Sequence, residues 1–320
     1  MGRGEGVMEK ELKLIKSIKE IPIREDFAPG HRLCTGCGIP QLVRMVLKAI
    51  PGPKVVVNAT GCLEVATTIF PYTSWKVPWV HNAFENAAAT ASGIEAAFRI
   101  LEKKRGIKRP KIIVFGGDGG TFDIGLQALS GALERGHDLI YICYDNEAYM
   151  NTGIQRSSAT PKGAATTTSP AGRVIPGKLE RKKDLIGIAV AHGVKYAATM
   201  NPAYPIDMYN KIVKAASIEG PTVLHYFTPC PTGWRADPSK SIEIARLAVL
   251  TRIWPLYEYE DGKYKINVLV KKPRPVEEYF KLQGRFRHLL DPKNKWLLEE
   301  IKRDIEENWR RLLRLAGIEE

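Results

Sequence analysis

The stretch Lys111-Ile112-Ile113-Val114-Phe115-Gly116-Gly117-Asp118-Gly119-Gly120 decides the fold that we expect for this chain. Its apolar, β-branched first half is typical of a buried strand, and residues 122–135 behind it have the apolar spacing of a helix. A second apolar run, at residues 139–144, predicts the next strand. Glycines between a strand and a helix let the backbone approach a diphosphate, whose negative charge the helix N-terminus attracts.

Two side chains that carry oxygen stand where these two strands end. Asp118 follows the first strand, and Asn146 follows the second strand 28 residues later. Because adjacent parallel strands end at the same edge of a sheet, we expect both side chains to lie in one ligand-binding crevice. A carboxylate, an amide oxygen, nearby carbonyls and diphosphate oxygens suit Mg²⁺. Gly-Asp-Gly alone also fits a plain tight turn, but the whole strand, turn, helix, strand and Asn pattern is more specific. A dinucleotide site would need Gly-x-Gly-x-x-Gly, which this stretch lacks.

The same rhythm of short β-branched runs and helical segments extends along most of the chain. It predicts an α/β fold with a parallel sheet that is covered by helices on both faces. The expected strands are 54–58, 111–115, 139–144, 194–198 and 222–227, and the expected helices are 9–20, 41–49, 86–103, 122–135, 185–192, 204–218 and 295–316. After about residue 242 the alternation stops, and residues 257–266 predict a β-hairpin. The polar segment 151–177 is long enough to indicate a functional loop.

Composition narrows the class of protein. The chain has 320 residues, of which 44% are hydrophobic and 26% charged, as in an ordinary soluble protein of one large or two modest domains. It has no apolar run long enough for a membrane span, and its charged start lacks the apolar centre of a secretory signal, so we expect a cytoplasmic protein. The formal charge of +13 favours an acidic electron-carrier protein as a partner over nucleic acid, since no nucleic-acid-binding motif is present.

Four of the five cysteines stand in turn-like segments rich in Gly or Pro. They are Cys34 and Cys37 of a Cys-x-x-Cys pair, Cys62 after Gly61, and Cys230 in Pro229-Cys230-Pro231. Four thiolates suit either Zn²⁺ or an iron–sulfur cluster, and the spacing matches neither a zinc ribbon nor a compact ferredoxin run. Scattered free thiols are a third interpretation. The fifth, Cys143, lies in an apolar run and is expected to be a buried core residue.

Several segments together resemble the β subunit of 2-oxoacid:ferredoxin oxidoreductases, above all that of pyruvate synthase. The resemblance covers roughly residues 27–290. The segments that carry it are His31-Arg32-Leu33-Cys34-Thr35-Gly36-Cys37-Gly38, His81-Asn82-Ala83-Phe84-Glu85-Asn86, Gly117-Asp118-Gly119-Gly120-Thr121-Phe122-Asp123-Ile124-Gly125, Tyr144-Asp145-Asn146-Glu147-Ala148-Tyr149-Met150-Asn151-Thr152-Gly153-Ile154-Gln155 and Pro229-Cys230-Pro231-Thr232-Gly233-Trp234.

This resemblance implies a thiamine-diphosphate-binding fold and a set of site residues. Asp118, Asn146 and the carbonyl of Ala148 would hold Mg²⁺, and Asn151 and Thr152 would act near the reactive end of the cofactor. The implied [4Fe–4S] ligands are Cys34, Cys37, Cys62 and Cys230, and the implied cofactor-binding residues are Gly61, Cys62, Gly117, Asp118, Gly119, Gly120, Asn146, Ala148, Met150 and Asn151. A redox cluster beside thiamine also has a purpose that a zinc staple there would lack.

The implied reaction is the reversible oxidative decarboxylation of pyruvate with coenzyme A to acetyl-CoA and CO₂, with electrons passing through the cluster to ferredoxin. The same chemistry on 2-oxoisovalerate or another branched 2-oxoacid is the closest alternative, and oxalate and 2-oxoglutarate are less favoured. Two other classes stay open: half of a non-redox thiamine decarboxylase or carboligase, and a zinc-stapled scaffold subunit without catalysis.

The sequence shows no second thiamine domain and no ferredoxin-like cysteine run, so the resemblance implies partner subunits. These are an α subunit with the pyrimidine-binding thiamine domain, a γ subunit and a ferredoxin-like δ subunit. We divide the chain into an N-terminal helical arm (1–26), a thiamine-diphosphate and [4Fe–4S] domain (27–241) and a C-terminal extension for subunit contacts (242–320). In the family, the glutamate that activates the aminopyrimidine comes from the α subunit, so we interpret Glu64 as a local or interface residue. The roles of His31, His81 and Glu85 stay undecided.

Overall fold

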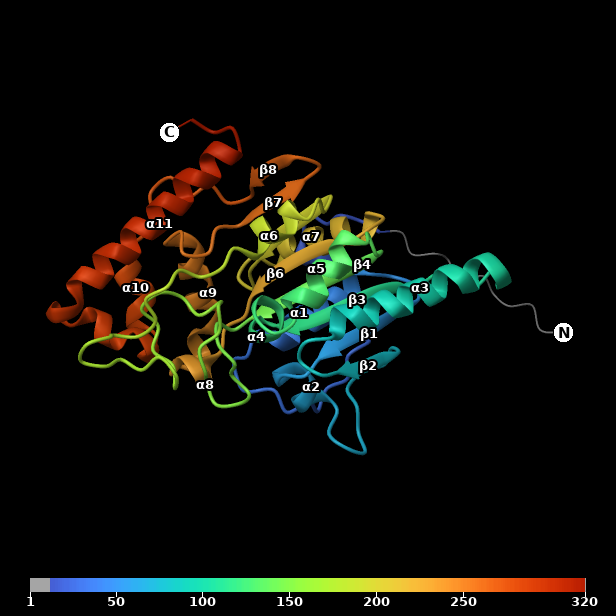
Figure 1. The fold of residues 1–320 in the computed structure, drawn as a ribbon, viewed down its shortest axis with the longest axis horizontal. Coiled ribbons are helices and arrows are strands. Elements are labelled where there is room, and N and C mark those ends of the chain that lie inside the picture. Colours follow the sequence, from blue (N-terminus) through green and yellow to red (C-terminus); the bar gives the residue numbers. More distant parts are fainter. Residues whose placement is uncertain (1–11, 320) are drawn as a thin grey trace.

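The computed structural model describes residues 12–319, and its strands form one sheet in the order β2-β1-β3-β4-β6-β5-β7-β8 (Figure 1). The strands are β1 (Lys54–Ala59), β2 (Trp79–Asn82), β3 (Lys111–Gly117), β4 (Leu139–Asp145), β5 (Tyr196–Met200), β6 (Thr222–Phe227), β7 (Tyr257–Glu260) and β8 (Lys263–Ile266). The first six in spatial order pair in parallel, and β7 and β8 add an antiparallel hairpin at one edge. The α/β fold expected from the sequence is confirmed.

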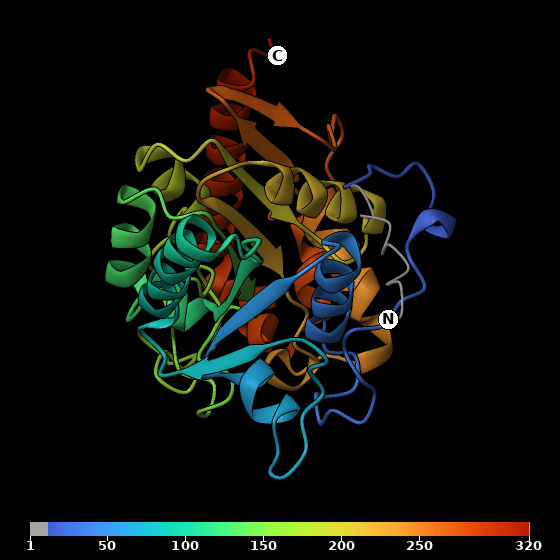
Figure 2. The same cartoon turned by 90° about the vertical axis from the view of Figure 1, so that its right-hand side faces the viewer.

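Helices cover both faces of this sheet. They are α1 (Ile39–Ala49), α2 (Cys62–Thr67), α3 (Ala87–Arg105), α4 (Asp118–Phe122), α5 (Leu126–Glu134), α6 (Leu185–Ala191), α7 (Pro205–Ser217), α8 (Pro231–Trp234), α9 (Ser241–Leu250), α10 (Val276–Lys281) and α11 (Lys295–Leu315). The apolar residues of α1 and α7 pack together with one face, and those of α3, α5 and α6 pack with the other. Figure 2 shows α1, in blue, and α3, in teal, on opposite sides of the strands.

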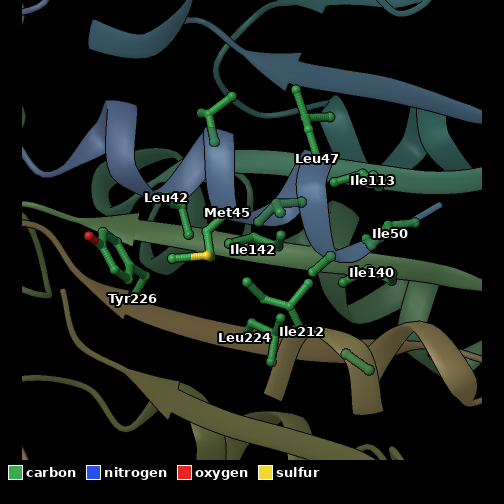
Figure 3. Close-up of a cluster of buried hydrophobic side chains, with 14 of the residues drawn as sticks. Leu42, Met45, Leu47, Ile50, Ile113, Ile140, Ile142, Ile212, Leu224 and Tyr226 are labelled. Carbon is green, nitrogen blue, oxygen red and sulfur yellow. The ribbon is translucent and has the colours of Figure 1, made fainter. Parts of the chain in front are cut away.

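The strand residues alternate between the two cores, as the twofold period of a strand requires. In β4, Ile140, Ile142 and Tyr144 belong to the core under α1 and α7, while Leu139, Tyr141 and Cys143 belong to the opposite core. Figure 3 shows Leu42 and Met45 of α1 and Ile212 of α7 around Ile142 and its neighbours. Because both faces are buried, the strand reads as one continuous apolar run.

The C-terminal part of the chain forms a third apolar core between α8, α9, α10 and α11. The guanidinium of Arg252 ties this part together, since it stacks on Trp309 of α11 at 4.7 Å and donates to the carbonyl of Val270 at 2.7 Å. Four short 3₁₀ turns accompany the helices of residues 12–319: η1 (Ile18–Glu20), η2 (Pro238–Lys240), η3 (Gly284–Leu290) and η4 (Pro292–Asn294). None of the helices in this range combines the length and apolarity that crossing a bilayer needs.

The helix predicted over residues 9–20 is wrong for its described part, because residues 12–17 have no helical structure and only η1 follows them. Residues 9–11 lie outside the described residues. Two tertiary hydrogen bonds explain the difference: the backbone N–H and carbonyl of Ile15 bind the side-chain amide of Asn210 at 2.8 and 2.9 Å. Ser17 and Glu20 then form a capping box around the short turn. The sequence analysis also missed β2, α2, α8, α9 and α10.

Replacing Ile142 by Ala tests the importance of the central strand. Ile142 is fully buried, so the lost contacts and the remaining cavity should lower the free energy of unfolding by about 2–5 kcal/mol in a urea titration. Leu315→Ala is the control, because the Leu315 side chain is 43% exposed and its loss should change the same quantity by less than about 1 kcal/mol. Equal effects of the two substitutions would contradict this assignment of the core.

Candidate functional site

A pocket lies at the carboxyl edge of the sheet, where β1, β3 and β4 end. Its lining consists of Thr60, Gly61, Cys62, Phe84, Gly117, Asp118, Gly119, Gly120, Tyr144, Asn146, Ala148, Tyr149, Met150, Asn151 and Thr152. The ten residues that the sequence analysis expects to bind the cofactor, and Thr152 with them, all belong to this lining. The fold therefore gathers these residues in one place, while the role of each stays a prediction.

The glycines of the Gly-Asp-Gly-Gly turn are required by close packing. A β-carbon at Gly119 would overlap the ring of Tyr149, whose hydroxyl donates to the carbonyl of Gly119 at 3.1 Å. A β-carbon at Gly120 would lie 3.0 Å from the carbonyl oxygen of Phe84. The turn thus fits between two other segments of the pocket wall only because it has no side chains at these positions.

Three oxygen atoms converge within this pocket. The side-chain oxygen of Asn146 faces Oδ1 of Asp118 at 2.9 Å and the carbonyl oxygen of Ala148 at 2.8 Å. Without a cation, the amide would be better turned over, so that its nitrogen donates to both oxygens. With the oxygen inward, the spacing matches an octahedral Mg²⁺ site, in which oxygens about 2.1 Å from the metal lie about 2.9 Å from each other. These donors, which the family resemblance assigns to Mg²⁺, fit that metal.

Asp118 is a buried carboxylate that forms no ion pair within residues 12–319. Its Oδ2 accepts a hydrogen bond from the hydroxyl of Ser157 at 2.5 Å. Burial, followed by the nearby charge of Asp145, raises the pKa of Asp118 well above its ordinary value. A divalent cation beside Asp118 would favour the ionised form and oppose this shift.

A group of buried charges lies beneath the turn that carries Asn146. Asp145 accepts hydrogen bonds from Nζ of Lys182 at 2.5 Å and from Nε2 of His225 at 2.7 Å. Burial alone would raise the pKa of Asp145, but Lys182 and His225 outweigh it and hold that pKa below its ordinary value. Burial lowers the pKa of His225. At neutral pH the imidazole is therefore neutral and donates to an ionised Asp145.

Glu147 holds the same turn from its other side. Its φ of 71° lies in the left-handed region, and its carboxylate is buried between Nζ of Lys182 at 3.1 Å and the guanidinium of Arg285 at 2.5 Å. Its backbone N–H donates to Asp145 at 2.9 Å, and its carbonyl accepts from Thr160 at 2.7 Å. All of these bonds fix the residue that stands between Asn146 and Ala148.

Arg285 also connects this turn to the segment that carries Cys230. Its guanidinium stacks on the ring of Trp234 at 4.0 Å, and the indole N–H of Trp234 donates to the carbonyl of Asn146 at 2.8 Å. Trp234 ends α8, which begins directly after Cys230. A residue of the C-terminal extension thereby orients the turn of the pocket and the cysteine segment together.

The four cysteines of interest lie near one another beside the pocket. Burial raises the pKa of Cys37, and the thiols of Cys230, Cys62 and Cys34 raise it further, so each lies within electrostatic reach of Cys37. Burial also raises the pKa of Cys62 to about 12 and that of Cys230 to about 11. Among residues 12–319, no three His, Cys, Asp or Glu side chains are close enough together to hold a metal ion. The thiols thus share a neighbourhood without forming a single-ion site, and Cys143 is buried in β4 as predicted.

Met150 and Asn151 connect the pocket to these cysteines. Against the larger effect of burial, a hydrogen bond from the side chain of Asn151 lowers the pKa of Cys62. A β-carbon at Gly233 would collide with the side chain of Met150 and would lie 3.2 Å from Sγ of Cys230. Cys62 itself lines the pocket, and single side chains separate the pocket from the thiol of Cys230.

The polar residues whose roles the sequence left undecided lie outside the pocket lining. Nε2 of His81 is 2.7 Å from the hydroxyl of Thr60 and 3.8 Å from the carboxylate of Glu64, so these side chains form a local cluster at the edge of the sheet. Nδ1 of His31 is buried without a partner in the described part of the chain, and Glu85 is exposed.

A second, larger cavity of about 770 Å³ lies beneath α11. None of the predicted site residues lines it, although Lys182 of the buried charge group does. Cations at its rim are paired with acids, as Arg181 is with Glu307 at 2.7 Å and Arg311 with Asp184 at 2.6 Å. We therefore place the candidate site in the pocket of the Gly-Asp-Gly-Gly turn.

Sequence reasoning assigned no role to several residues that shape this pocket, namely Tyr144, Ser157, Lys182 and Arg285. The sequence does give an indication for Ser157, because this residue lies in the long polar segment 151–177 that indicates a functional loop. Lys182 lies in the basic run Arg181-Lys182-Lys183, which has no specific motif, and Arg285 is 138 residues from the Glu147 that it binds. Tyr144 looked like an ordinary core residue of an apolar strand.

Comparisons with known proteins identify the family of the chain. Residues 59–226 match the family described as thiamine pyrophosphate enzyme, C-terminal TPP binding domain. The chain is 56% identical over 293 residues to pyruvate synthase subunit PorB of Methanocaldococcus jannaschii. This alignment covers 91% of this chain and 97% of that protein. It is 49% identical over 311 residues to ketoisovalerate oxidoreductase subunit VorB of Pyrococcus furiosus, with 95% and 97% covered.

The solved structure of 2-oxoglutarate:ferredoxin oxidoreductase from Magnetococcus marinus has the same fold. The alignment has a TM-score of 0.54 and 21% sequence identity, and it covers 88% of this chain and 97% of that one. At this identity the likeness concerns the fold alone.

Replacing Asp118 by Asn separates stability from metal binding. Because the pKa of Asp118 is raised in the folded chain, the metal-free protein should lose stability as the pH rises from about 4 through the raised pKa, and Asp118→Asn should remove this loss. The variant should therefore melt higher than the parent at pH 7 without metal. Its affinity for Mg²⁺ with diphosphate should nevertheless fall by at least about 100-fold in calorimetric titrations.

Asp207→Asn is the matched control. Asp207 is also an aspartate whose pKa burial raises, but it lies on α7 and binds the buried Lys211 at 2.8 Å. Its replacement should leave the affinity for Mg²⁺ unchanged, because Asp207 lies outside the pocket lining. An Asp118→Asn variant that binds Mg²⁺ and diphosphate as tightly as the parent would contradict the assignment.

Proposed function

The chain belongs to the β subunits of 2-oxoacid:ferredoxin oxidoreductases, and on this premise we propose that it carries the thiamine diphosphate, Mg²⁺ and [4Fe–4S] cluster of a pyruvate:ferredoxin oxidoreductase. The observation that carries the proposal is the convergence of three oxygens from Asp118, Asn146 and Ala148 inside the pocket of the Gly-Asp-Gly-Gly turn. With the amide oxygen of Asn146 turned inward, these three oxygens would hold one side of a cation, and a diphosphate would complete its coordination.

In this proposal the bound thiamine diphosphate supplies the carbanion chemistry that removes CO₂ from a 2-oxoacid, and the chain orients it. Asp118, Asn146 and the carbonyl of Ala148 hold Mg²⁺, and the glycines admit the diphosphate. Asn151 and Thr152 lie in the same lining, and we assign them to the reactive end of the pocket. Asn151 also touches Cys62, which supports a reacting group close to the thiols.

For the thiols, the proximity of Cys34, Cys37, Cys62 and Cys230 supports a cluster. A zinc ion would need four sulfur atoms about 3.8 Å apart, because its bonds to sulfur are about 2.3 Å long. In residues 12–319 no such compact group is present. The choice of a [4Fe–4S] cluster over zinc therefore follows from the family resemblance, and the proximity of the four thiols is compatible with it.

The pocket also supports a requirement for partner subunits. Its enclosed volume is about 30 Å³, whereas sites for organic ligands enclose roughly 300–1,000 Å³. We propose that an α subunit with a thiamine-binding domain closes it, and that γ and ferredoxin-like δ subunits supply the coenzyme A and electron-transfer functions. Phe70 and Tyr72, 93% and 77% exposed, lie in the loop between α2 and β2, which projects at the bottom of Figure 2 and offers an apolar contact for such a partner.

Chemical analysis of the chain, purified without oxygen, tests the cluster. We expect about four iron and four sulfide per chain, and we expect Cys230→Ser to lose most of the iron because a ligand is removed. Cys143→Ala should keep the iron, since Cys143 is buried in β4 away from the other thiols. Stoichiometric zinc in place of iron would support the scaffold alternative and overturn the redox proposal.

Steady-state assays of the assembled complex test the substrate. We expect pyruvate to be preferred over 2-oxoisovalerate in kcat/KM by roughly 10-fold or more, the discrimination that a methylene or two gives in an apolar pocket. The chain without its partners is the control and should form no acetyl-CoA. A preference for 2-oxoisovalerate would assign the branched substrate, and full turnover by the isolated chain would contradict the need for an α subunit.

A further inference from the structure

Tyr144 is the residue before the last in β4, and its side chain extends from the core to the pocket. Its side chain is 1% exposed, and its ring belongs to the apolar core under α1 and α7. The residue is nevertheless part of the pocket lining. Only the hydroxyl distinguishes it from a plain apolar core residue, so the question is what this hydroxyl binds.

Within residues 12–319, the hydroxyl of Tyr144 is buried and has no acceptor for its proton. Other buried tyrosines of the sheet are satisfied: the hydroxyl of Tyr196 donates to Glu258 at 2.8 Å, and that of Tyr226 donates to the carbonyl of Gly38 at 3.1 Å. Burying a hydroxyl without an acceptor is unfavourable. An isolated one that lines a pocket indicates that a ligand provides the missing acceptor.

The surroundings of the hydroxyl show from where that acceptor must come. A β-carbon at Gly61 would lie 2.6 Å from it, and one at Gly117 would lie 3.4 Å from it, so it sits against both glycines at the ends of β1 and β3. The backbone N–H of Leu63 donates toward the phenol oxygen, but it cannot accept the proton of the hydroxyl. The thiol of Cys62 is not within hydrogen-bond reach either.

We propose that the hydroxyl of Tyr144 is a cofactor-binding group that donates a hydrogen bond to the diphosphate of the thiamine cofactor. The inference rests on the proposed function of the pocket and adds a residue that the metal and glycine motifs do not include. Gly117, which packs against the phenol, opens the Gly-Asp-Gly-Gly turn, and a charged phosphate oxygen is the strongest acceptor that could enter there.

Tyr144→Phe tests this, because it removes the hydroxyl and nothing else. The full chain, with any subunits that copurify, is stripped of cofactor and titrated calorimetrically with thiamine diphosphate and with inorganic diphosphate, each with Mg²⁺. The variant should bind both roughly 3- to 10-fold more weakly, which is the usual effect of one lost hydrogen bond. Its melting temperature without ligand should be unchanged or higher, because the hydroxyl that is removed has no acceptor for its proton.

Tyr196→Phe is the matched control, since its hydroxyl is satisfied and lies outside the pocket lining. It should lower the melting temperature and leave both affinities unchanged. A parent protein that binds neither ligand would contradict the proposed function itself. A parent that binds both ligands and a Tyr144→Phe variant that binds them equally well would overturn only the role of Tyr144. A loss confined to thiamine diphosphate would place the acceptor on the thiazolium side and overturn the diphosphate assignment.

Discussion

The buried carboxylate of Glu147 is the point on which the site depends. It stands in a left-handed backbone conformation between the side chain of Asn146 and the carbonyl of Ala148, and two cations, Lys182 and Arg285, bind it. Removing one partner of a buried, paired carboxylate strongly destabilises the folded state, so the turn has little freedom to relax. The convergence of oxygens in the pocket is a direct result of this restraint.

The charges around the turn do not balance within the chain. Asp118, Asp145 and Glu147 contribute three negative charges, while Lys182 and Arg285 contribute two positive ones and His225 is neutral, which leaves one negative charge. Asp145 and Glu147 each bind a cation directly, so the excess falls on Asp118. Burial and, after it, the charge of Asp145 raise the pKa of Asp118, so an ionised Asp118 is unfavourable without a cation. The fold thus creates a local demand for positive charge where its oxygen atoms already point inward.

Much of this arrangement follows from local sequence pattern, and the rest depends on contacts between residues that are far apart in the sequence. Asp118 and Asn146 could be placed together because β3 and β4 are consecutive parallel neighbours that end at one edge. The contact of Arg285 with Glu147 spans 138 residues, and no local pattern marks a pair so far apart. The predicted N-terminal helix failed for the same reason, since a hydrogen bond from Ile15 to the distant Asn210 holds the segment out of helical form. Periodicity predicted the elements, whereas tertiary contacts decided the details of the site.

The position of Arg285 has a consequence for the biosynthesis of the protein. Strands β1, β3 and β4 end by residue 145, so the segments that carry the Gly-Asp-Gly-Gly turn and Asn146 are synthesised in the first half of the chain. The turn at Glu147, however, lacks its guanidinium partner until residue 285 of 320 is available. The turn beside the pocket therefore gains its last ionic restraint only when translation is nearly finished.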